Sequence, residues 1–524
     1  MPTLRFLLLA ATLLIACSDD PAAVDEDGEP THEEEGDDDG SNDSSGSLDG
    51  GSLDARRPDA KPAEEARPDA TVAADAAAPP IVDAEVEPPV RIKPSITPPL
   101  VTGPLAGKPI TTSTLGDLDL AEHGYIEQEF FIEGTANAYK AKGTLGIDGK
   151  WGAERDTQAR YVSRLVVRRP LRAQAFNGTV VVEWLNVTGT IDTEIAFPFA
   201  WEELLRGGYA YVGVTVQKAG SDNLKPADAK YADLVHPGDT YAYDLYAQAG
   251  MAVGWPDGVK PLGELVPQRL IAYGESQSAM RMITYVNAIH PLTKVYDAYF
   301  IHSRAGWGAA VGDESDALLG DGKPVQVRAD LGARVLQFFT ESEIVLALGP
   351  AHAARQADTD WVRTWEVAGT AHADTRLLGK DTDLACGGAT VNDGPQHYVV
   401  KAALRSLHRW LADGVAPAHG SELKLTTDKS AIARDAHGNA QGGIRTPKVD
   451  VPTATHSGVS ANPACMLFGY STPFTTGKLR TLYPTHQDYV SRVEVAAKEA
   501  REAGFLLPEE ETTIVAEATS AAVP

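Results

Sequence analysis

The sequence is poor in several features that would define a protein class. Its 524 residues include only three cysteines and 7% aromatic side chains. Three cysteines exclude a disulfide-dense scaffold and a zinc site built from four thiolates. Basic residues are also scarce, with 46 Lys and Arg against 73 Asp and Glu, a formal charge of −27. Because phosphate contacts need clustered Lys and Arg, this balance argues against a nucleic-acid partner.

No hydrophobic run reaches the roughly 20 residues that cross a bilayer. A shorter apolar run, residues 6–16, follows Arg5 and has the features of a secretory signal. It ends in Leu14-Ile15-Ala16-Cys17, which resembles the lipobox of bacterial lipoproteins. That resemblance implies that residues 1–16 are a signal peptide and that Cys17 is lipidated. The protein would then be anchored to a membrane of the bacterial cell envelope, outside the cytoplasm. An ordinary signal peptide with an incidental cysteine is the alternative.

The negative charge is concentrated behind this segment. Residues 18–90 hold 23 acidic and 4 basic side chains, a net −19, whereas residues 91–524 hold 50 and 41, a net −9. The acidic segment contains no Phe, Trp or Tyr. Low hydrophobicity with high net charge cannot offset the entropy lost on ordering. We therefore predict a disordered acidic tether over residues 17–94 and one folded domain over residues 95–524.

Lipid on Cys17 would leave two cysteines, Cys386 and Cys465. An even pair in an oxidising compartment suggests a disulfide, and two buried free thiols are the alternative. The disulfide would close a loop of about 80 residues and stabilise the fold by on the order of 4 kcal/mol.

Beyond residue 95, strand and helix patterns alternate along the chain. The predicted strands cover residues 124–132, 161–168, 179–185, 209–216, 269–273, 298–302, 335–339 and 364–367. One predicted helix has Trp201, Leu204 and Leu205 on one face and ends at Gly207. The other predicted helices cover residues 241–253, 276–289 and 396–411, and the second of these ends before Pro291. This alternation predicts an α/β fold with a mostly parallel central sheet and helices on both faces. Chemistry in such sheets gathers at the carboxyl ends of the strands.

One strand end carries a candidate nucleophile. The strand at 269–273 runs into Gly274-Glu275-Ser276-Gln277-Ser278, and a helix follows. Strand, tight turn and helix are the context in which a G-x-S-x-G pattern indicates an exposed serine nucleophile, here Ser276. The fifth position is Ser278 in place of Gly, which is still a small residue. The alternative is a polar turn in which Ser276 only caps the helix.

A serine nucleophile needs a base and a carboxylate that orients the base. After the strand at 335–339 come Glu341 and Glu343. We predict Glu343 as the acid and keep Glu341 as the competitor, with two solvated loop charges as the alternative. His372 follows the next strand in a loop rich in Gly and Ala, and we predict it as the general base.

An oxyanion hole needs two N–H donors where negative charge develops. The residue after the nucleophile, Gln277, is expected to supply one. The second is expected from the loop after the strand at 179–185, from Asn186 or Val187. No HGGG motif marks this loop.

At this point the sequence resembles the α/β-hydrolase superfamily, and more closely a bacterial family of α/β-hydrolase domain proteins. The segments that carry the resemblance are 182–187, 273–279, 302–304, 442–447 and 482–484 followed by Tyr489. The resemblance covers roughly residues 95–515. It implies an α/β-hydrolase fold enlarged by insertions and a C-terminal extension, but no particular substrate.

Two hypotheses follow. The first is a lipid-anchored serine hydrolase that cleaves a small-molecule carboxylic ester through an acyl-enzyme. It would need no cofactor, since no H-E-x-x-H metal motif and no dinucleotide fingerprint is present. The second is a surface binding lipoprotein that keeps the fold without turnover. Amide substrates and the oligomeric state stay open.

Overall fold

The computed structural model describes residues 91–112, 118–312, 322–346, 349–379, 382, 386 and 389–524. The predicted signal peptide, Cys17 and the predicted tether up to residue 90 lie outside these residues. Within the described chain, no helix is long and apolar enough to cross a membrane.

A large sheet organises the described residues. The strands are β1 (Leu100–Thr102), β2 (Tyr125–Lys142), β3 (Gly152–Pro170), β4 (Thr179–Trp184), β5 (Ala210–Val214), β6 (Asp257–Gly258), β7 (Arg269–Glu275), β8 (Ala298–His302), β9 (Arg334–Phe339), β10 (Val362–Glu366), β11 (Ala454–Ser457) and β12 (Tyr470–Pro473). In the described part of the chain, ten of them form one sheet in the order β10-β9-β8-β7-β4-β5-β3-β2-β1-β6, and β11 and β12 pair separately. Neighbours from β10 to β5 are all parallel, whereas β3 is antiparallel to β5 and to β2. The predicted, mostly parallel sheet is confirmed.

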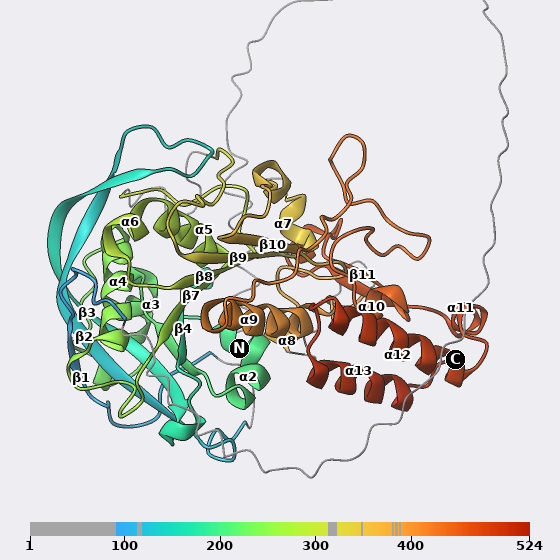
Figure 1. Ribbon diagram of the computed structural model, residues 1–524, viewed down its shortest axis with the longest axis horizontal. Coiled ribbons are helices and arrows are strands. Elements are labelled where there is room, and N and C mark those ends of the chain that lie inside the picture. Colours follow the sequence, from blue (N-terminus) through green and yellow to red (C-terminus); the bar gives the residue numbers. More distant parts are fainter. Residues whose placement is uncertain are drawn as a thin grey trace, which may run out of the picture. The chain divides into compact units, whose positions relative to one another are not determined.

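Helices cover both faces of this sheet (Figure 1). The helices of the described chain are α2 (Ala196–Arg206), α3 (Lys218–Leu224), α4 (Ala242–Gly254), α5 (Gln277–Thr284), α6 (His290–Thr293), α7 (Glu341–Ile344), α8 (Thr375–Leu378), α9 (Gln396–Ala412), α10 (Pro447–Asp450), α11 (Thr476–Leu482), α12 (His486–Glu502) and α13 (Pro508–Ser520). Helices α4 and α5 pack on one face of the sheet and α2 and α9 on the other, whereas α12 and α13 form a separate cluster.

The two faces follow from alternation along each strand. In β4, Val180 and Val182 pack with α4 and α5, whereas Val181 between them packs with α2 and α9. In β8, Ile301 belongs to the first cluster and Phe300 to the second. Successive side chains of a strand point to opposite faces, so a strand with apolar residues at every position must be buried on both. This is why the central strands have continuous hydrophobic runs.

Two regions differ from the sequence prediction. The antiparallel strands β2 and β3 pair from Tyr125↔Pro170 to Lys142↔Gly152, well beyond the predicted 124–132 and 161–168. The hydrophobic pattern fades because the distal half of β3 is largely exposed, and in β2 the buried Ala136, Ala138 and Tyr139 are followed by three exposed residues, while the backbone pairing continues.

The second difference concerns the helix predicted to end before Pro291. The helical path continues through a wider π turn (Tyr285–Ile289) into α6, where Pro291 occupies the first turn. Proline is tolerated there because first-turn N–H groups have no intrahelical acceptor.

Candidate active site

Ser276 lies at the sharp turn between β7 and α5. Its backbone has φ 57° and ψ −121°, a strained conformation for a residue with a side chain. The Ser276 N–H donates to the His302 carbonyl at 3.0 Å, and the Ser276 carbonyl accepts from Met280 N–H at 3.0 Å, which fixes the turn on both sides. A Cβ at Gly274 would lie 2.9 Å from the Ser278 carbonyl oxygen, so this position requires glycine.

The three predicted triad residues lie within hydrogen-bonding distance of one another. Ser276 Oγ is 2.8 Å from His372 Nε2, and His372 Nδ1 is 2.5 Å from Glu343 Oε1. Each comes from the carboxyl end of a different parallel strand: β7, β10 and β9. The histidine therefore bridges the hydroxyl and the carboxylate, the geometry of a general base aligned with its nucleophile.

Glu343 is held by its own short helix. Thr340 caps α7, and its N–H and hydroxyl donate to Glu343 Oε2 at 2.8 and 2.7 Å. This leaves Oε1 for His372. Burial alone would raise the pKa of Glu343, but the bonds from His372 and Thr340 lower it below its usual value. The group is therefore an ionised acceptor at neutral pH.

Glu341, the competing candidate, is engaged elsewhere. It is fully buried, and Arg434 Nη1 lies 2.7 Å from its Oε2. The N–H groups of Gly369 and Gly458 donate to the same carboxylate at 2.6 and 3.1 Å. Glu341 thus ties three loops together, and of the two predicted acids only Glu343 contacts His372.

A second carboxylate, which the sequence prediction missed, approaches the same histidine. Glu275 Oε1 lies 3.3 Å from His372 Nε2. The Asn186 amide donates to the Glu275 carbonyl at 3.1 Å and to Glu275 Oε2 at 3.3 Å. Burial raises the pKa of Glu275 to about 8. Burial favours neutral His372, but Glu275 and Glu343 outweigh it and raise its pKa to about 9.

The backbone N–H groups predicted to bind an oxyanion differ in whether another acceptor already engages them. Gln277 is the first residue of α5, where an N–H has no intrahelical acceptor. The Asn186 N–H is engaged with the Thr193 carbonyl at 3.0 Å, so the structure does not leave it for an oxyanion. Thr188 N–H donates to the Asn186 side chain at 2.8 Å. Among the described residues, Val187 N–H has no assigned acceptor, which leaves it as the available member of the predicted pair.

Residues 96–516 match a protein family described as Alpha/beta hydrolase domain. The chain belongs to this family. No curated protein sequence matches it.

Solved structures with detectable likeness to this α/β hydrolase include esterases. An esterase of Rhizomucor miehei is 11% identical, covers 54% of this chain and 85% of its own, and has a TM-score of 0.29. Acetyl xylan esterase 1 of Thermoanaerobacterium sp. is 9% identical, covers 44% of this chain and 79% of its own, and has a TM-score of 0.23. A thermostable esterase of Pseudomonas putida is 14% identical, covers 57% of this chain and 85% of its own, and has a TM-score of 0.30. Likeness at these identities and scores carries no conclusion about substrate.

A small recess is lined by Ser276 and His372 of this α/β hydrolase. Its polar side is formed by Asn186, Thr188 and Glu275, and its apolar wall by Ala373, Leu377, Leu467 and Phe468. No group of three or more His, Cys, Asp or Glu that could hold a metal ion occurs among the residues the structure describes.

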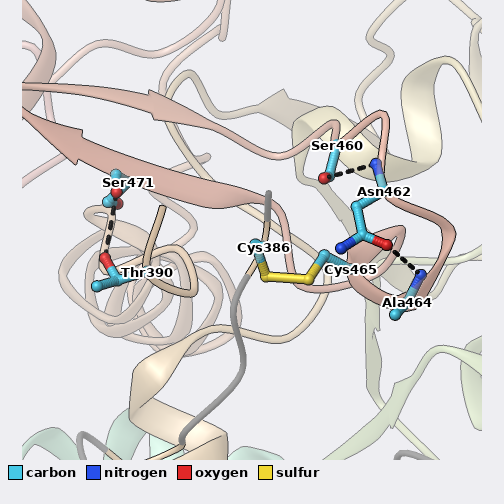
Figure 2. The surroundings of a disulfide bond; sticks show 7 residues. All are labelled: Cys386, Thr390, Ser460, Asn462, Ala464, Cys465 and Ser471. Atoms are coloured by element: carbon cyan, nitrogen blue, oxygen red, sulfur yellow. Dashed lines mark hydrogen bonds between the residues drawn. A yellow bond between two sulfur atoms is a disulfide. The ribbon is translucent and has the colours of Figure 1, made fainter. Parts of the chain in front are cut away.

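A disulfide lies close to the apolar wall in the sequence of the loop that carries Leu467 and Phe468. The predicted bond between Cys386 and Cys465 is present (Figure 2). The Cys465 carbonyl accepts from Phe468 N–H at 3.0 Å, and the Leu467 carbonyl accepts from Ala373 N–H at 2.9 Å. The loop that brings Leu467 and Phe468 to the recess is therefore fixed to the disulfide at one end and to the His372 loop at the other.

Proposed function

We propose that this protein is a serine hydrolase that cleaves a carboxylic ester and is anchored to a bacterial membrane by lipid on Cys17. The observation that carries the enzymatic part is the hydrogen-bond chain from Ser276 Oγ through the His372 ring to Glu343. Such a chain is needed to activate a hydroxyl whose own pKa is far too high for it to act as a nucleophile at neutral pH.

In the first half-reaction, Ser276 Oγ attacks the ester carbonyl carbon while its proton passes to His372 Nε2. Glu343 holds the imidazole in the required tautomer and stabilises its charged form. The N–H groups of Gln277 and Val187 donate to the developing oxyanion. The tetrahedral intermediate then collapses, the C–O bond to the alcohol breaks, and the alcohol oxygen takes the proton from Nε2.

In the second half-reaction, water attacks the acyl carbon on Ser276 and gives its proton to His372 Nε2. Collapse releases the carboxylic acid, and the proton returns to Ser276 Oγ. The apolar wall of the recess, which includes Leu377 and Phe468, suits the acyl part of a small ester.

The test is covalent labelling with a fluorophosphonate probe, which reacts with activated serines. We expect the wild type to be labelled and Ser276→Ala to be unlabelled and at least about 10³-fold slower on p-nitrophenyl esters. Ser278→Ala is the matched control, since it removes a hydroxyl from the same turn and should keep labelling. A folded wild type that takes no label and turns over no ester would reject the enzyme and favour the binding lipoprotein.

The lipid anchor is supported by the segment Leu14-Ile15-Ala16-Cys17 and by the disulfide, which suits an oxidising compartment. Expression in bacteria with radiolabelled palmitate should label the wild type and leave Cys17→Ser unlabelled. Equal labelling of both proteins, or of neither, would contradict the anchor without bearing on the triad.

A further inference from the structure

We propose that Glu275 is a positioning residue that acts through His372, as a second carboxylate acceptor for the proton that Nε2 carries in both half-reactions. This inference rests on the proposed function. Glu275 directly precedes the nucleophile, so the turn that exposes Ser276 also delivers this carboxylate to the base.

Each ring nitrogen of His372 lies near a different carboxylate. Glu343 Oε1 lies 2.5 Å from Nδ1, and Glu275 Oε1 lies 3.3 Å from Nε2. Nε2 is also the nitrogen that lies 2.8 Å from Ser276 Oγ. When Ser276 gives up its proton, the charged ring therefore has a carboxylate at each N–H, whereas a triad alone supplies only the one at Nδ1.

The carboxylate of Glu275 is fixed in this position. Asn186 donates to its other oxygen, Oε2, and to its backbone carbonyl, which joins the loop after β4 to the end of β7. Glu275 is 3% exposed. Screening by water is small at such a site, so the attraction to a charged imidazole is stronger than at the surface.

The other ionisable groups that face this pair do not neutralise it. Glu343 from α7 and Glu183 from β4 are acidic and act on Glu275 by repulsion. His302 from β8 is neutral, since burial lowers its pKa to about 3. Within the described residues, no Lys or Arg forms an ion pair with Glu275, and His372 is its only cationic partner.

The consequence is an alkaline requirement for activity. The kcat/KM value needs neutral His372, whose pKa stands at about 9 through the attraction of both carboxylates against the effect of burial. Activity should therefore rise with pH up to that region. In Glu275→Gln the side chain keeps its size but loses its charge, so the midpoint should move to lower pH by about 1–3 units. The plateau kcat should fall about tenfold, because the base is weaker and its charged form is less stabilised.

The experiment measures kcat/KM against pH on a p-nitrophenyl ester for the full chain and three variants. We expect Glu275→Gln to show the downward shift and Glu275→Asp, which keeps the charge, to recover most of the wild-type midpoint. Glu183→Gln is the matched control, because it removes a buried carboxylate of the neighbouring strand that does not contact His372. A midpoint that stays in place in folded Glu275→Gln, or that moves equally in Glu183→Gln, would overturn the inference.

A second readout separates this inference from the proposed function. The His372 pKa can be followed by NMR with ¹³C-labelled histidine, the signal being assigned by its loss in His372→Asn. A lower pKa in Glu275→Gln than in the wild type supports the contact without any turnover, and equal values overturn it. Failure of fluorophosphonate labelling, by contrast, would reject the hydrolase itself.

Discussion

The antiparallel and the parallel parts of the sheet both bury charged side chains, but they treat the charge differently. In antiparallel β3, Arg164 lies between Glu129 and Asp192, at 3.0 and 2.9 Å. Four residues further along the same strand, Arg168 pairs with the carboxylates of Glu127 and Glu194, at 2.6 and 2.7 Å. Burial disfavours the charged guanidinium, yet the carboxylates raise the pKa of both arginines.

At the carboxyl edge of the parallel strands, buried Glu183 has dipoles for partners, whereas Glu341 is paired with Arg434. Glu183 accepts from Tyr211 and from the N–H groups of Ile195 and Ala196 at the start of α2. Burial raises its pKa to about 8, as it does that of Glu275. The buried arginines of the antiparallel part each have two carboxylate partners, whereas Glu183 and Glu275 near the site have no Lys or Arg partner among the described residues, and burial raises their pKa values. Buried charge is thus neutralised by ion pairs in the antiparallel part, whereas at Glu183 and Glu275 burial shifts the pKa of the carboxyl group.

The largest effect is expected within α7, where Glu341 is paired with Arg434 and Glu343 contacts His372. Glu343→Gln should lower kcat by about 10³–10⁴-fold, because the amide no longer holds the His372 tautomer or stabilises its charge. Glu341→Gln breaks an ion pair with Arg434 and should lower stability, with kcat per folded enzyme changed only a few-fold. Steady-state kinetics normalised by active-site titration, together with thermal unfolding, separate the two effects. A larger loss of kcat in Glu341→Gln would contradict the assignment.

The three residues of the proposed triad could be chosen from the sequence because each signal is local. Ser276 is marked by a strand, a turn and a helix, and Glu343 and His372 each follow a strand in the chain order that the fold uses. The local sequence pattern does not decide which of Glu343 and Glu341 contacts the histidine. It depends on Thr340, whose cap directs one acid inward, and on Arg434, which lies 93 residues from Glu341 in sequence.

The contact between Glu275 and His372 could not be read from the sequence for the same reason. It requires the register of β7, β8, β9 and β10 and the orientation of a side chain next to a strained turn. The available signal was an acid directly before the nucleophile. The sequence left Asn186 and Val187 as alternatives because the pairing of the Asn186 N–H with Thr193 closes a loop that carries no sequence signature.

The next largest effect is expected in the antiparallel part. Arg164→Met would leave Asp192 buried without its cation and remove one of the cations beside Glu129. Breaking a buried pair in this way costs about 3–5 kcal/mol. Urea unfolding should show a lower midpoint with an unchanged m-value, while the His372 pH profile of the remaining folded enzyme stays in place. A loss below about 1 kcal/mol would show that these charges are not needed for stability.

The smallest effect is expected at an exposed arginine of the same strand. Arg160 lies four residues before Arg164 in β3 and pairs with Glu133 at 2.7 Å, but the two side chains are 58% and 42% exposed. Water screens such a pair, so Arg160→Met should change the free energy of unfolding by about 0.2–1 kcal/mol. The two variants compare a buried arginine that has two carboxylate partners with an exposed arginine that has one. Equal losses at the two positions would mean that location in the hairpin, and not removal from water, decides the contribution of these arginines.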